Sequence, residues 1–173
     1  MTRIKPKQKA LIATLFFTAF GLTGFALNAA EWQTTLPLFI FYLILVFNTY
    51  FSVGLFSSII PTNNTLQKVI DLFLLIIYTT LAFSVSNPMQ FIYSCSLLFI
   101  VASAKYVFLI GLVEQPKLLK RKILVDLSGV LACLFAFGGV ITGHRTLSLW
   151  SLTLVFAFAN TLLFSIWPLY HLD

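Results

Sequence analysis

A lysine lies inside an apolar run that is long enough to cross a membrane. The run covers residues 88–113 and contains Lys105. About 20 apolar residues span a bilayer core, and a charge within such a span is costly and marks a functional or ion-pairing site. Lys105 precedes Val113 by about two helical turns, or roughly 12 Å, which is farther than its aliphatic stem reaches. We therefore expect Lys105 to have an acidic partner on another helix.

Polar residues of four other predicted helices lie at a similar depth. Asp71 and Asp126 lie roughly 7 Å inside the starts of their helices, and Asn48 and Asn160 lie at the level of Lys105. A lysine–aspartate pair offsets part of the cost of desolvating either charge alone. The sequence therefore predicts a cluster in the cytoplasmic half of the bundle, as a candidate ligand or ion site, made of Lys105, Asp71, Asp126, Asn48 and Asn160.

Each member of this cluster also has a purely structural interpretation. Asp71 and Asp126 could complement the macrodipole at the starts of their helices and pair with Lys68 and Lys122, one turn earlier. Lys105 could belong to a buried ion pair without any ligand. The two asparagines could hydrogen-bond between helices, as polar side chains do in membrane bundles.

The composition excludes a water-soluble protein. The chain has 173 residues, of which 60% are hydrophobic and 9% charged, whereas soluble domains carry roughly 25% charged residues. We therefore predict an all-α membrane protein, with residues 1–173 forming a single integral membrane domain in the lipid bilayer. The apolar runs predict a bundle of six transmembrane helices, at approximately residues 10–30, 36–58, 66–85, 88–113, 120–141 and 147–170.

Helix starts and stops can be assigned to particular residues. Pro37 is expected in the first turn of the second helix, where its missing N–H has no consequence. Asn87 and Pro88 predict a capped, proline-initiated start for the fourth helix. The first apolar run follows a basic leader, so it is either a retained helix or a signal peptide; its length favours the retained helix.

The charge distribution predicts the orientation. The formal charge is +6, with 11 Lys and Arg residues, and all of these except Lys105 and Arg145 fall at one face of the predicted bundle. Positive charge marks the cytoplasmic side, so both termini are expected in the cytoplasm, in the inner membrane of a bacterium. The same distribution explains the basic character without nucleic acid, which we do not expect as a partner.

A weak internal repeat is a further interpretation. Similar short motifs occur around Asn48, Lys105 and Asn160, and Asp71 and Asp126 follow a lysine near the starts of the third and fifth helices. These similar motifs predict three tandem two-helix hairpins. Repeats of this kind often frame a transport site, but chance similarity among apolar helices is the alternative.

The sequence offers little for enzymatic chemistry. It contains no HExxH, no GxSxG and no phosphate-binding loop. Cys95 and Cys133 lie in apolar runs without metal-ligand spacing, so we expect two buried thiols, and no metal or cofactor. Enzymatic activity stays open, with its absence favoured, and no catalytic residue is assigned.

Two functions of different classes remain. The first is a transporter or channel, or its membrane subunit, that uses the polar cluster. The alternative is a non-catalytic subunit or an assembly or scaffold protein of a membrane complex, with protein partner subunits or a homo-oligomer. Transporters often contain broken helices, and Gly138-Gly139 is the only candidate break.

Overall fold

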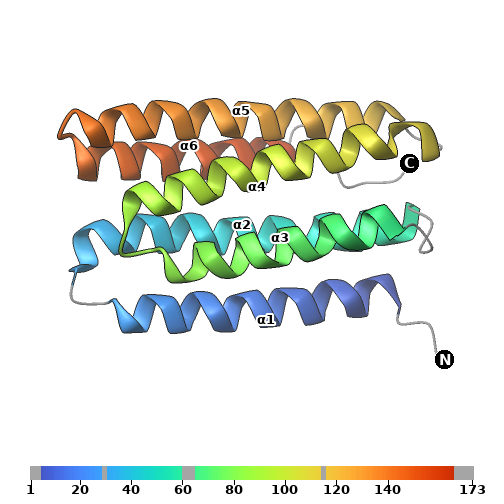
Figure 1. Ribbon diagram of the computed structural model, residues 1–173, viewed down its shortest axis with the longest axis horizontal. Coiled ribbons are helices and arrows are strands. Elements are labelled where there is room, and N and C mark those ends of the chain that lie inside the picture. Colours follow the sequence, from blue (N-terminus) through green and yellow to red (C-terminus); the bar gives the residue numbers. More distant parts are fainter. Residues whose placement is uncertain (1–4, 29–30, 60–64, 114–115, 166–173) are drawn as a thin grey trace.

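The fold is a bundle of six α-helices, as the composition predicted. The computed structural model describes residues 5–28, 31–59, 65–113 and 116–165, and these residues contain no strand. The 3₁₀ turn η2 (Ile110–Leu112) continues the fourth helix. The helices in chain order are α1 (Pro6–Leu27), α2 (Trp32–Ile59), α3 (Thr65–Phe83), α4 (Pro88–Leu109), α5 (Pro116–Ile141) and α6 (Arg145–Ser165) (Figure 1).

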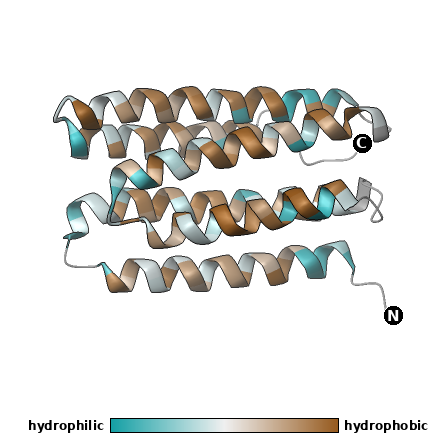
Figure 2. Cartoon of the chain, in the orientation of Figure 1, coloured by the Kyte–Doolittle hydropathy of each residue, from teal (hydrophilic) through white to brown (hydrophobic). Residues whose placement is uncertain are grey.

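Every helix is long and apolar enough to cross a membrane. Large apolar side chains such as Leu15, Phe73 and Phe135 are exposed on the outside of the bundle, where lipid rather than water is their favourable surrounding. Brown apolar segments run along all the helices, and hydrophilic residues gather at the starts of α1 and α5 (Figure 2). The chain is an integral membrane protein with six spans among its described residues.

The six helices form a closed ring. Each helix packs mainly against two neighbours, in the order α1–α2–α6–α5–α4–α3 and back to α1. The three sequential pairs α1/α2, α3/α4 and α5/α6 all pack together, as tandem hairpins would. In a ring that followed chain order, α2 would pack on α3 and α1 on α6. In this protein the first pair is reversed, so that α1 packs on α3 and α2 packs on α6. The internal repeat stays a prediction.

The two halves of the bundle differ in packing. We call the end where α1, α3 and α5 begin the basic end, because it carries Lys7, Lys9, Lys68, Lys117, Lys120 and Arg121. The half away from it, the packed half, has a solid core in which Leu38, Phe41, Phe91 and Leu149 are fully buried. The Phe41 ring stacks on Phe156 with centroids 4.2 Å apart. A smaller apolar cluster around Phe56, Tyr106, Leu109 and Leu119 lies near the basic end.

The start of α2 differs from the prediction. The helix begins at Trp32 rather than at residue 36, so Pro37 lies inside it and not in its first turn. A proline there cannot donate to the carbonyl group of the residue four positions earlier. The Pro37 carbonyl accepts a hydrogen bond of 2.8 Å from the Thr153 hydroxyl of α6, so this segment also ties two helices together.

Other boundaries differ by up to one turn. Pro6 begins α1 and Pro116 begins α5, since proline is favoured in a first turn; the sequence analysis started both helices four residues later. Lys117, which precedes the predicted helix, consequently lies on α5. Asn87 caps α4 and accepts from the Gln90 N–H, as predicted. The predicted ends of the first and sixth helices fall outside the described residues.

Candidate functional site

A cavity lined by apolar, polar and charged side chains lies in the half of the bundle at the basic end. Its volume is about 410 Å³, within the range of about 300–1,000 Å³ typical of small-molecule sites. Side chains of α1 to α5 line it, from the first turns of α1, α3 and α5 and the second halves of α2 and α4. The cavity collects four of the five predicted site residues: Asn48, Asp71, Lys105 and Asp126.

Lys105 and Asp71 form an ion pair between α4 and α3. The sequence predicted an acidic partner for this lysine. A tight turn joins the two helices, and they diverge toward the basic end (Figure 1), where the pair connects them. The Lys105 side chain is 13% exposed and that of Asp71 is 48% exposed, so the pair lies at an accessible edge of the cavity and not in its closed interior.

Asp126 pairs with Lys122 and not with Lys105, the lysine of the predicted cluster. The Lys122 ammonium group donates to its carboxylate at 2.7 Å, one turn apart on α5, and the two side chains are 6% and 2% exposed. The structural interpretation of Asp126 predicted this pair, and the pair lies buried within the bundle. The second carboxylate oxygen of Asp126 is also buried and has no hydrogen-bond partner within the described residues.

The two asparagines both line a smaller second cavity. Its volume is about 40 Å³, and Asn48, Lys122, Asp126 and Asn160 all line it. The Asn160 amide donates to the Phe156 carbonyl at 2.8 Å. Its own oxygen is buried and accepts no hydrogen bond from the part of the chain that the structure describes. Asn160 thus lies beside the main cavity and does not line it.

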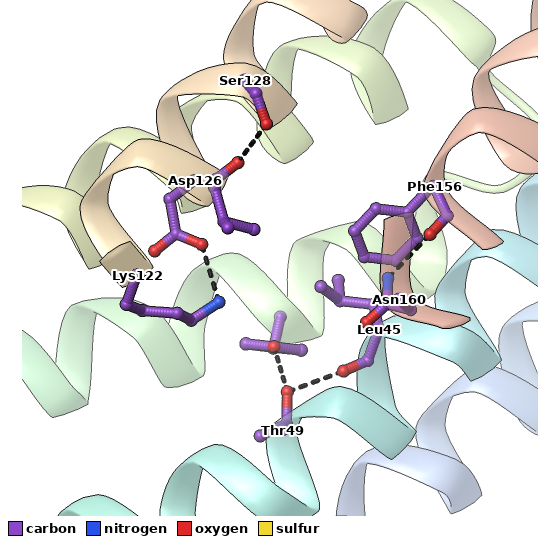
Figure 3. Close-up of polar contacts among 9 residues, drawn as sticks. Leu45, Thr49, Lys122, Asp126, Ser128, Phe156 and Asn160 are labelled. Carbon is purple, nitrogen blue, oxygen red and sulfur yellow. Dashed lines mark hydrogen bonds and ion pairs between the residues drawn. The ribbon is translucent and has the colours of Figure 1, made fainter. Parts of the chain in front are cut away.

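A close-up shows how these groups face one another (Figure 3). Lys122 on α5 extends toward the side of the bundle where Thr49 of α2 and Asn160 of α6 lie. Thr49 donates to the Leu45 carbonyl at 2.8 Å and is also hydrogen-bonded to the Tyr78 hydroxyl. Since the threonine hydrogen is used in the first bond, the Tyr78 hydroxyl donates in the second.

The sequence analysis missed several lining residues. Tyr78, two turns after Asp71 on α3, stacks on Phe17 with centroids 4.5 Å apart. It also lines the cavity, and its hydroxyl is hydrogen-bonded to Thr49. Lys9 and Lys68 line the cavity as well. Spacing along one helix indicates which residues share a face, but which helices surround a cavity depends on the ring order.

No family model, curated protein or solved structure matches the chain. The fold defines its class as a six-helix integral membrane protein. Cys95 and Cys133 are buried free thiols, as predicted. Among residues 5–28, 31–59, 65–113 and 116–165, no three His, Cys, Asp or Glu side chains gather as a metal site would require. The distinguishing feature of this bundle is its charged cavity.

Proposed function

We propose that this protein is a membrane transport protein and that the larger cavity is its solute site. The observation that carries the proposal is a cavity in the half of the bundle at the basic end, next to the packed half. Alternating access requires a site that one end of the protein closes off, and the packed half can supply that closure. By the positive-inside rule, the basic end faces the cytoplasm, and a bacterial inner membrane fits this orientation.

The buried charges support the same proposal. Ionisable residues inside membrane spans are costly and mark solute or ion pathways. Lys122 and Asp126 lie in the cavity wall although a pair of apolar side chains would fill the same space at lower cost. An ion pair beside a solute site can interact with a charged solute, which an apolar pair cannot do.

The divergence of α3 and α4 supplies a movable element. Near the basic end the two helices are connected by the Lys105–Asp71 ion pair. An accessible ion pair contributes little net stability, so a solute or a proton can replace one partner at low cost. Rearrangement of this pair is therefore part of the proposed transport cycle.

The test is solute flux in proteoliposomes that contain the purified protein alone. Charge movement is recorded on a solid-supported membrane while amino acids, carboxylic acids, phosphate esters, nucleosides and inorganic ions are applied in turn. We expect one class to give a signal that Lys105→Ala abolishes. Lys117→Ala removes a charge at the same end of the bundle, but outside the cavity lining, and should retain the signal.

The alternative predicts a different result. A non-catalytic subunit would show no flux alone and would co-purify with the same partner protein in a fixed ratio. That combination would overturn the transport proposal.

A further inference from the structure

The cavity lining also indicates which class of solute would fit, on the condition that the cavity is the solute site proposed above. We propose that the cavity binds an amphipathic anion, with its charged head at the rim lysines, Lys9 and Lys68, and its apolar body against the aromatic wall. A small phosphate or carboxylate monoester with a short hydrocarbon or aromatic tail has this chemistry.

The charges of the lining favour an anion. Four lysines and two aspartates line the cavity, which gives it a formal charge of +2. Asp71 and Asp126 each have a lysine partner, Lys105 and Lys122 respectively. The rim lysines also line the cavity, are exposed, and form no ion pair with any residue that the structure describes. Two cations are therefore left for an incoming anionic group.

The rim lysines come from two different helices. Lys9 lies in the first turns of α1 and Lys68 in the first turn of α3, and these two helices pack side by side in the ring. Both side chains therefore approach the cavity from the basic end. Because both lysines line the same cavity, each ammonium group can approach a phosphate or carboxylate head that is bound there.

The remaining wall fits an apolar body. Phe17, Phe56 and Leu98 line the cavity together with other aliphatic and aromatic side chains. The cavity of about 410 Å³ holds roughly ten or more water volumes, so a lone inorganic anion would fill a small part of it. A ligand that carries both a charge and an apolar part uses both kinds of surface.

The experiment measures binding to the whole protein in phosphatidylcholine nanodiscs by calorimetry. Three probes are compared, namely hexyl phosphate, inorganic phosphate and hexyltrimethylammonium. We expect hexyl phosphate to bind about ten-fold or more tightly than either of the other two. Inorganic phosphate tests the contribution of the tail, and hexyltrimethylammonium tests the sign of the charge.

Matched double variants locate the site. Lys9→Gln with Lys68→Gln should weaken hexyl phosphate binding about ten-fold. Lys117→Gln with Lys120→Gln removes the same charge from the same end of the bundle but outside the lining, and should leave binding unchanged. Equal weakening by both pairs, or equal binding of the cationic probe, would overturn the proposal.

The source of the anion is tested by changing the lipid. If an anionic lipid head occupies the site in the membrane, hexyl phosphate should bind more weakly in nanodiscs with phosphatidylglycerol, and the rim variants should abolish this competition. If the ligand is a soluble amphipath, the lipid change should have the same small effect on all variants. Either result retains the amphipathic anion as the ligand class.

Failure of this inference can be separated from failure of the transport proposal. Ala102→Phe places a large side chain in the cavity wall. If the cationic probe binds and this variant prevents its binding, the ligand class is wrong and the cavity remains a solute site. If no probe binds and no solute gives flux, the transport proposal itself fails.

Discussion

At the scale of single residues, the Lys122–Asp126 pair is the most constrained feature of the protein. Both side chains are almost completely buried. Separating a buried ion pair leaves the remaining charge in an apolar surrounding, whereas replacing both partners with apolar residues of similar volume is often neutral or stabilising. The pair is therefore expected to be sensitive to single substitutions and tolerant of a double one.

This contrast gives the first prediction. Asp126→Leu should lower the free energy of unfolding by about 3–5 kcal/mol, because the Lys122 ammonium group loses the buried carboxylate. Lys122→Met combined with Asp126→Leu should restore stability to within about 1 kcal/mol of the natural protein. Reversible unfolding in mixed detergent micelles measures both values. A double variant as unstable as the single one would contradict the interpretation.

The second prediction concerns the other ion pair. Because Asp71 is half-exposed, Lys105→Met should cost less than about 1 kcal/mol of stability, far less than the buried pair. Its transport signal should nevertheless be lost. The same unfolding assay, run beside the flux assay, checks this. A large loss of stability would mean that Lys105 is a structural residue.

The site was only partly predictable at this scale. The depth of Lys105 predicted an acidic partner on another helix, and Asp71 was one of two aspartates at a similar depth. Depth alone could not choose a partner for Asp126, because Lys122 on the same helix and Lys105 on another lie at comparable levels. The distinction depends on the direction in which each side chain points, which the packing of α4 against α5 determines.

At the scale of helices, glycines identify the closest contacts. A Cβ atom at Gly24 of α1 would collide with the Ala82 carbonyl group of α3, whereas one at Gly138 of α5 would meet no other atom within 4 Å. Small residues of this kind let two membrane helices approach closely. Gly24 is therefore required for the contact between α1 and α3.

The third prediction compares these two positions. Gly24→Ala should destabilise the bundle by about 1–3 kcal/mol, because α1 must move away from α3. Gly138→Ala should be neutral or stabilising by up to about 1 kcal/mol, because alanine favours a helix and has room there. Thermal unfolding in one detergent ranks the two variants. An equal effect at both positions would argue against close packing of α1 on α3.

Helix types were easier to predict than helix starts. Long apolar runs identified all six spans, and Asn87 and Pro88 located the start of α4. Pro37 was assigned to a first turn although α2 begins earlier, since proline is also tolerated within membrane helices when other groups satisfy the backbone. Gly138-Gly139, considered as a break, lies within the continuous helix α5.

At the scale of the whole molecule, the two halves differ in accessibility, and this gives the fourth prediction. Ser52 lines the cavity, whereas Ser94 is buried and does not line it. Ser52→Cys should react with a membrane-impermeant thiol reagent applied at the basic end, and Ser94→Cys should not. The buried thiols of Cys95 and Cys133 should give a low background.

Mass spectrometry of inside-out and right-side-out vesicles measures the labelling. Reaction of Ser52→Cys at the cytoplasmic face alone would agree with the orientation proposed from the basic residues. Reaction from both faces would indicate a continuous pore and exclude a closed packed half. The overall order of the helices was not predictable, because similar apolar spans can be arranged in a ring in several ways.

The reversed position of the first hairpin has a consequence for biogenesis. During synthesis α1 to α5 emerge first, and they form an open arc in which one flank of α2 still faces lipid. Only α6 covers that flank, through packing and through the Thr153–Pro37 hydrogen bond. Until α6 has been inserted, the ring stays open on that side. We therefore expect the nascent chain to need protection of its charged interior by an insertase or chaperone until that point.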